Sequence, residues 1–283
     1  MPTAHLSAGS IEYDDTGGNG PCLVLLHGVL MNGTVWRKVL ARLTPEYRCV
    51  VPTLPLGAHR IPMTADADLS NEGLSRLIAE FLDRLDLTDV TLVINDWGGA
   101  QLLVDQDLHA RVAAMVLVAC EAFENFPPGR PGFQLGLLAR LPGGLRLLGR
   151  MARCAVMRRA LSRSLVRHPI PDSILHGWFE PITTTSGVAR DLRRFCVTVP
   201  LRRNRNWSAG LSRFDKPALV VWACDDVLMP REHGQRLAET LRRGRLVEIA
   251  DSATLIPEDQ PAQLAAHLRS FVGTVSGRNT ADT

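Results

Sequence analysis

The sequence has few lysines, few tyrosines and no long apolar run. Only two of its 32 basic residues are lysine, so arginine carries almost all of the positive charge. No apolar stretch reaches the roughly 18–20 residues that a membrane-spanning helix needs. Residues 1–20 are polar and glycine-rich, without the pattern of a signal peptide. We therefore expect a cytoplasmic protein that does not span a membrane.

Motifs for metals and cofactors are also missing. The six cysteines are scattered without a CxxC pair, and several lie in apolar, strand-like runs. Such cysteines are typically small buried side chains in a reduced compartment. No HExxH helix, glycine-rich dinucleotide fingerprint or P-loop occurs. The sequence predicts no metal and no cofactor. No motif indicates nucleic-acid binding, and nothing indicates an oligomeric state.

Acidic residues are absent from one long segment. Between Phe126 and Pro171 there are nine arginines and no aspartate or glutamate. The segment is either a basic face that attracts an anionic substrate, an acyl carrier or a membrane surface, or a set of amphipathic helices whose arginine stems cover apolar surface. Leu141, Leu145 and Leu148 are spaced as on an ordinary surface helix, which favours the second interpretation.

Short apolar runs alternate with helical patterns along most of the chain. We predict strands at 10–13, 22–26, 48–52, 90–94, 115–120, 218–222 and 246–249, and helices at 35–43, 71–85, 98–108, 231–241 and 261–271. This alternation is typical of an α/β protein with a mostly parallel sheet and helices on both faces.

One part of the chain breaks the alternation. From residue 121 to about 207 there are helical patterns and Pro/Gly turns but no strand signal. We therefore predict a core made of residues 1–121 and 209–283, with a helical cap at 122–208 inserted between them. The polar end of the chain, 275–283, is expected to be disordered.

The most informative local pattern is the strand-to-helix turn around Asp96. A strand running straight into a helix through Asn95-Asp96-Trp97-Gly98-Gly99 forms an elbow that exposes one side chain at the carboxyl end of the sheet. A carboxylate there suits attack at carbon with formation of an alkyl ester. Equally, Asp96 could simply cap the following helix, since aspartate is a favoured N-cap.

A second segment belongs beside this elbow. His27-Gly28 follows a strand predicted to lie next to it. The backbone N–H groups of Val29 and Trp97 could then form an oxyanion hole. We interpret His27 as a hydrogen-bonded brace rather than a base.

Together, these segments resemble a known family. His27-Gly28 with Trp36 nine residues on, the Asp-Trp-Gly-Gly elbow, and residues 223–230 are similar to the haloalkane dehalogenase and epoxide hydrolase branch of the α/β-hydrolase superfamily. The resemblance implies an eight-stranded sheet with a helical cap. It also implies that Asp96 is the nucleophile and that Trp97 gives an indole N–H and an amide to the leaving group or oxyanion. Asp226 matches the orienting acid, and Glu121 matches an alternative position for that acid.

The chain departs from this family in four places. Thr254 occupies the position of the histidine that acts as general base, and a hydroxyl group cannot take a proton from water near neutral pH. The two tyrosines, Tyr13 and Tyr47, lie outside the cap, whereas epoxide hydrolases donate from cap tyrosines. Val29 stands where many dehalogenases hold halide with asparagine. Residues 52–60 replace the usual glycine-rich loop.

Other side chains are candidates to fill these roles. His59 is the best histidine to replace the missing base, because its loop leads to the carboxyl edge of the sheet. Asn32 lies near the halide position. Trp178 and Trp207, in the cap, could donate to a substrate, although each is more often a core or lid anchor.

Three functions follow from this pattern. The first is an Asp96-nucleophile hydrolase that acts on an epoxide or alkyl halide. The second is a non-hydrolytic enzyme, such as an isomerase, cyclase or lyase, in which Asp96 shuttles a proton; a carboxyl group buried beside Trp97 would have the raised pKa that this needs. The third is a catalytically inactive ligand-binding homologue. In each case we expect a small hydrophobic or amphiphilic partner.

Overall fold

An eight-stranded sheet forms the centre of the computed structural model, which describes residues 1–201 and 205–279. Its strand order is β1-β2-β4-β3-β5-β6-β7-β8. The strands are β1 (Thr3–Leu6), β2 (Gly9–Asp15), β3 (Cys22–Leu26), β4 (Arg48–Pro52), β5 (Val90–Asp96), β6 (Val112–Cys120), β7 (Ala218–Ala223) and β8 (Gly244–Ile249). β1 and β2 pair antiparallel, as do β2 and β4, and every other pair is parallel. The predicted fold class is confirmed.

The central strands are apolar along their whole length because both of their faces are covered. Every residue of β5 and β7 is buried, and so is almost all of β6. Strands covered on both faces are continuous apolar runs of valine, isoleucine and leucine. This explains why the sequence shows runs there instead of an alternation of apolar and polar residues.

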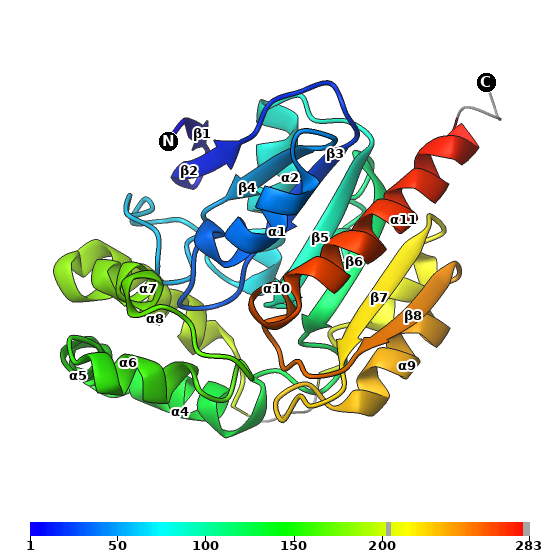
Figure 1. Ribbon diagram of the computed structural model, residues 1–283. Coiled ribbons are helices and arrows are strands. Elements are labelled where there is room, and N and C mark those ends of the chain that lie inside the picture. Colours follow the sequence, from blue (N-terminus) through cyan, green and yellow to red (C-terminus); the bar gives the residue numbers. More distant parts are fainter. Residues whose placement is uncertain (202–204, 280–283) are drawn as a thin grey trace.

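Helices cover both faces of this sheet. α11 (Pro261–Asn279) crosses in front of the strands in Figure 1 and packs against α1 (Arg37–Leu43), while α9 (Arg231–Thr240) lies behind β7 and β8. α2 (Asn71–Arg84) packs near β1 and begins at Ser70, whose hydroxyl accepts the Gly73 N–H at 3.0 Å. Shorter helices are η1 (Gly33–Trp36), η2 (Gly99–Gln101), α3 (Leu102–Asp105), η3 (Ala209–Arg213) and α10 (Ile256–Asp259).

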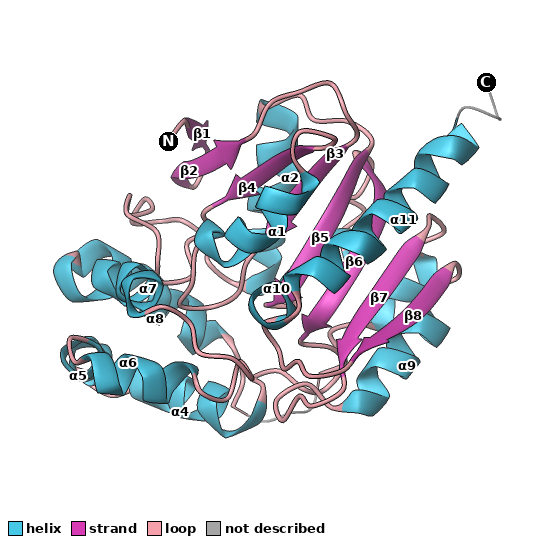
Figure 2. Cartoon of the chain, in the orientation of Figure 1, coloured by secondary structure: helices cyan, strands magenta, loops and turns pink. Residues whose placement is uncertain are grey.

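In the described residues, five α-helices lie between β6 and β7, ahead of the short helix η3. They are α4 (Gly129–Arg140), α5 (Gly144–Ala152), α6 (Ala155–Ser162), α7 (Asp172–Thr184) and α8 (Ser186–Thr198), here called the cap helices. Figure 2 shows them as a group without strands, beside the end of the sheet toward which the β5 arrowhead points. In parallel sheets this carboxyl end is where sites form. None of the helices in the described part of the chain is both long and apolar enough to cross a membrane.

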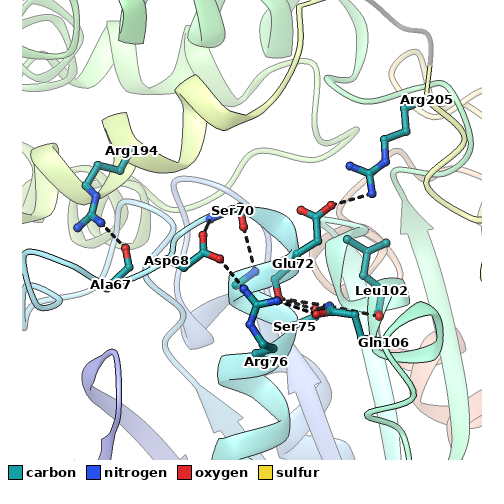
Figure 3. Close-up of polar contacts among 11 residues, drawn as sticks. Ala67, Asp68, Ser70, Glu72, Ser75, Arg76, Leu102, Gln106, Arg194 and Arg205 are labelled. Carbon is teal, nitrogen blue, oxygen red and sulfur yellow. Dashed lines mark hydrogen bonds and ion pairs between the residues drawn. The ribbon is translucent and has the colours of Figure 1, made fainter.

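Polar contacts tie the cap helices and the segment after them to the core. Figure 3 shows the Arg194 guanidinium donating to the Ala67 carbonyl and Arg205 forming an ion pair with Glu72 at the start of α2, at 2.7 Å. Asp191 of α8 accepts the Met63 N–H at 2.7 Å. These contacts hold the cap helices over the carboxyl end of the sheet.

Two predicted helices differ in length from those observed. The helix expected at 98–108 consists only of η2 and α3, because Asp107 takes a positive φ of 55° and the Leu108 N–H bonds back to Leu103 O, which ends the helix early. At the other end of the chain, α11 continues past Val275 to Asn279, so these residues are helical where a disordered tail was expected. Positions 280–283 of that tail lie outside the described residues.

Candidate active site

Asp96 is the last residue of β5 and has a strained backbone. Its φ is +62°, a left-handed conformation that is uncommon for non-glycine residues and that fits the sharp strand-to-helix turn of an elbow. The following short helix, η2, has Gly98 as its N-cap and no side-chain cap. Asp96 therefore does not cap that helix. Its side chain is only 6% exposed and lines a cavity beneath the cap helices.

The carboxylate of Asp96 rests against the segment that follows β3. The Val29 N–H donates to Asp96 Oδ2 at 3.1 Å. Gly28 lies so close that a Cβ on it would overlap the carboxylate. Position 28 therefore needs glycine for space, because any side chain would displace Asp96.

Glu121 lies next to Asp96 at the end of β6. Its backbone N–H donates to the Asp96 carbonyl at 2.9 Å, and its carboxylate Oε2 accepts the Gly98 N–H at 2.7 Å. The side chain is 3% exposed and lines the same cavity as Asp96. The end of β6 and the elbow thus bring two carboxyl groups to one cavity.

Burial raises the pKa of both Asp96 and Glu121. It raises the pKa of Asp96 to about 7; the Val29 hydrogen bond opposes this rise and the charge of Asp226 adds to it. It also raises the pKa of Glu121 well above its usual range, with a further contribution from the neighbouring charge of Asp96. Because the charges repel in a poorly solvated place, the pair holds at least one proton near neutral pH.

The cavity itself is apolar and has a volume of about 200 Å³. Leu135, Leu138, Leu148 and Leu161 of the cap helices form part of its wall, together with Phe126, Phe179 and Phe195. Among the described residues that line it there is no arginine, lysine or histidine. Its two carboxyl groups and its lack of positive charge make the cavity a poor site for an anion and a good one for a neutral molecule.

Thr254 and Asp226 form a separate pair behind the cavity wall. The Thr254 hydroxyl donates to Asp226 Oδ1 at 3.0 Å, and the same oxygen accepts the N–H groups of Leu228 and Met229. Asp226 Oδ2 is buried without a hydrogen-bond partner. Burial raises the pKa of Asp226. The threonine is fully buried and does not line the cavity.

The histidines predicted to lie near Asp96 have other partners. His27 Nε2 accepts the Leu54 N–H at 2.9 Å, so Nδ1 carries the proton and donates to the Gly28 carbonyl at 2.8 Å. Burial lowers its pKa to about 4, as suits a neutral brace. His59 faces Asp191 of α8 at 3.4 Å instead of Asp96. The prediction that His59 replaces the missing base is therefore not supported by its position.

The Trp97 side chain does not reach the cavity. Its indole Nε1 donates to Asn71 Oδ1 of α2 at 2.9 Å, and its backbone N–H donates to the Asn95 carbonyl at 2.8 Å. Both donors that we expected Trp97 to give to the oxyanion or leaving group are thus engaged elsewhere. Asn32 is equally occupied, since its side chain caps η1 through the Thr34 N–H at 3.1 Å.

The two cap tryptophans differ in position. Trp178 of α7 lines the cavity, but its indole Nε1 donates to Thr34 Oγ1 at 2.8 Å, which anchors α7 to the core. Trp207 is buried against the Phe126 ring, with ring centroids 5.3 Å apart, and does not line the cavity. Both are anchors in this conformation.

Sequence reasoning missed two residues that shape the site. Asn71 turns the Trp97 indole away from the cavity, and Asp191 engages His59. Asn71 directly follows Ser70, the N-cap residue of α2. A buried asparagine in a helix is unusual enough to indicate a polar partner. Asp191 gave no signal, because its partners come from a distant loop. In the described residues, no group of three or more potential ligands could hold a metal ion.

Known proteins resemble this chain over most of its length. Residues 21–261 match the model of the alpha/beta hydrolase fold family. Haloalkane dehalogenase 2 of Mycobacterium tuberculosis (strain ATCC 25618 / H37Rv) is 26% identical, over 92% of this chain and 90% of that protein. An alpha/beta hydrolase fold protein from Burkholderia ambifaria (TM-score 0.76, 24% identity, 94% and 96% coverage) and an esterase from Thermogutta terrifontis (TM-score 0.70, 20% identity, 97% and 98% coverage) share its fold. The chain belongs to the alpha/beta hydrolase fold family.

Proposed function

We propose that this protein is an enzyme that moves a proton on a neutral, hydrophobic small molecule, with Asp96 as base and Glu121 as acid. One observation carries the proposal: two buried carboxyl groups line a single apolar cavity in which no described residue supplies a cation or an imidazole. A base is most effective when its pKa is near the working pH, and the pKa of Asp96 is about 7.

The proposed reaction is an isomerisation: substrate and product have the same atoms, and no water is consumed. Ionised Asp96 takes a proton from a carbon next to a carbonyl group of the substrate. The electron pair of that C–H bond forms a C=C bond, and the carbonyl oxygen takes the proton of Glu121. In a substrate with a second C=C bond next to this carbon, the product of this step is a dienol. Asp96 returns its proton to the far carbon of the dienol, the C=C electrons shift by one bond, and the enol O–H proton returns to Glu121 as the C=O bond re-forms. The double bond of the substrate has then moved, and Asp96 is again ionised and Glu121 again protonated. Thr254 in place of histidine is no obstacle, because no water has to be activated.

Deuterium exchange tests this proposal. Hydrophobic ketones and unsaturated carbonyl compounds are incubated with the protein in D₂O, and deuterium in the substrate is measured by NMR. We expect Asp96→Asn to lower exchange by about 10²–10⁴-fold, Glu121→Gln to lower it as well, and Thr254→Val to change it by less than about threefold. Exchange that survives in Asp96→Asn, or tight binding without any Asp96-dependent exchange, would contradict the proposal.

A second candidate is an Asp96 nucleophile that forms an alkyl ester. The Val29 N–H on Asp96 Oδ2 favours it, because this donor would stabilise the ester carbonyl during its hydrolysis. The similarity to haloalkane dehalogenase 2 points the same way. Release of the ester, however, requires a base for water, and no imidazole lines the described part of the cavity.

Mass spectrometry of the intact protein separates the two candidates. After exposure to alkyl halides and epoxides, the nucleophile candidate predicts a stable adduct on Asp96 that Asp96→Asn lacks. Thr254→His should release that adduct, because Asp226 Oδ2 has a free lone pair for the ring N–H. Proton transfer predicts an unmodified protein in the same experiment.

A further inference from the structure

The outer faces of α4, α5 and α6 combine exposed apolar side chains with arginine. Phe133, Leu137 and Leu141 follow one another at intervals of four residues on and just after α4, and Leu147 of α5 and Val156 of α6 extend the apolar surface. These five side chains are between 43% and 69% exposed, and they are most of the large exposed apolar residues in the described chain. Exposed clusters of this kind mark interaction sites.

Arginines share these faces. Arg130 lies three residues before Phe133 on α4, and Arg159 and Arg163 lie three and seven residues after Val156, so each set is on one side of its helix. Arg146, Arg150 and Arg153 are exposed on or beside α5. None of these six takes part in an ion pair among the described residues. The acid-free segment found in the sequence therefore contributes six exposed arginines without an ion-pair partner among the described residues, whereas its Arg158 is buried and paired with Asp172.

This charge does not serve the cavity. The cavity is lined by two carboxyl groups and by no arginine of the described chain. The same three helices have apolar residues on both sides. On the inner side, Leu135 and Leu138 of α4, Leu148 of α5 and Leu161 of α6 line the cavity. The helices therefore separate an apolar cavity from an apolar and basic outer surface. Figure 1 shows them at the edge of the molecule, away from the sheet.

We infer that the outer face of α4, α5 and α6 docks on an anionic lipid bilayer. Amphipathic helices lie in the bilayer interface when leucine and phenylalanine insert between lipids and flanking arginines contact anionic headgroups. An apolar surface alone would also suit a second copy of the chain. The unpaired arginines favour the lipid, because two copies would bring like charges together.

Flotation with lipid vesicles tests this inference on the full chain. Vesicles of phosphatidylcholine alone are compared with vesicles that also contain phosphatidylglycerol. We expect binding only with phosphatidylglycerol, weakened by added salt. Arg146→Glu/Arg150→Glu should bind at least about tenfold more weakly, since each arginine near the surface contributes. Phe133→Ser/Leu137→Ser should also bind more weakly, because insertion of apolar side chains is lost.

A matched control has the same charge change elsewhere. Arg243→Glu/Arg245→Glu alters two exposed arginines, one just before β8 and one within it, far in sequence from the cap helices, and should bind like the unmodified chain. Equal weakening in this control would show a general charge effect and overturn the inference. Equal binding to vesicles with and without phosphatidylglycerol would also overturn the inference. The same holds if vesicles do not bind and Phe133 and Leu137 are instead required for a dimer or for an acidic protein partner. All variants change exposed side chains, and unchanged thermal unfolding confirms that they are folded.

Discussion

Asp96 has a protonation equilibrium that differs between the folded and the unfolded chain. In the unfolded chain an aspartate ionises near pH 4, and in the fold the pKa of Asp96 is about 7, mainly because of burial. Between these two values the folded state holds a proton that the unfolded state has lost. The stability associated with this proton is fully present below about pH 4 and is lost as the pH rises toward 7.

Replacing Asp96 with asparagine should therefore stabilise the protein at high pH. The amide carries no charge, and its oxygen can still accept the Val29 N–H. We expect Asp96→Asn to raise the free energy of unfolding by on the order of a few kcal/mol near pH 8, with a gain that shrinks toward about pH 4. Denaturant unfolding at several pH values measures this. A gain that is constant with pH, or a loss at pH 8, would count against a buried, proton-binding Asp96.

Gly28 offers a steric test of the same site. A Cβ at position 28 overlaps the Asp96 carboxylate, although the backbone there has no positive φ that would itself disfavour alanine. Gly28→Ala should therefore push Asp96 off the Val29 amide, destabilise the protein by about 1–3 kcal/mol and abolish substrate exchange.

The matched control is Gly177→Ala in α7. A Cβ there meets no atom within 4 Å, so the substitution should be neutral or stabilise by up to about 1 kcal/mol through helix propensity. Thermal unfolding and deuterium exchange are measured on both variants. If Gly28→Ala behaves like this control, that result contradicts a close approach of Asp96 to position 28.

At the scale of elements, α10 connects the cap helices to the loop that carries Thr254. Asp259, its last residue, accepts three backbone N–H groups: those of Arg167 and His168 after α6, and that of Ala253 next to Thr254. One nearly buried carboxylate thus holds two distant segments together.

Removing this carboxylate should loosen the cap. Asp259→Ala leaves three donors without a partner, and we expect a loss of about 2–4 kcal/mol in the free energy of unfolding. Gln263→Ala, on the exposed face of α11 nearby, should change it by less than about 0.5 kcal/mol. Limited proteolysis should also cut Asp259→Ala faster after α6. Equal stability of the two variants would mean that Asp259 does not link the cap to the core.

The sequence predicted elements well where apolar patterns are local. β3 and β4 coincide with the predicted 22–26 and 48–52, because covered strands show continuous apolar runs. β1 was not predicted as a separate strand, since Thr3–Leu6 has only two apolar positions and gains its order by pairing with β2. The early end of α3 depends on the backbone conformation of Asp107, which residue patterns do not encode.

The site was predictable only in part, for a related reason. The elbow, Gly28 and Glu121 follow strand ends and could be placed from topology. The direction of the Trp97 indole depends on Asn71 in a different helix, and the partner of His59 is a cap residue. Side-chain directions set by such distant contacts are not contained in a local motif.

For the molecule as a whole, the cap helices decide the chemistry of the core. The sheet brings Asp96 and Glu121 to one edge, and the cap helices bury that edge under leucine and phenylalanine. Without this cover the two carboxyl groups would be solvated and both ionised near neutral pH. The proposed proton transfer therefore depends on one property: Asp96 and Glu121 together hold a proton at a pH where exposed acids have lost theirs.

Carboxyl carbon NMR measures that property directly, without knowledge of the substrate. The protein is labelled with ¹³C at aspartate and glutamate side chains, and Asp96→Asn and Glu121→Gln assign the two signals. We predict that one carboxyl group titrates near pH 7 and that the other still carries its proton at that pH. Two signals that both titrate below about pH 5, as exposed acids do, would contradict the account.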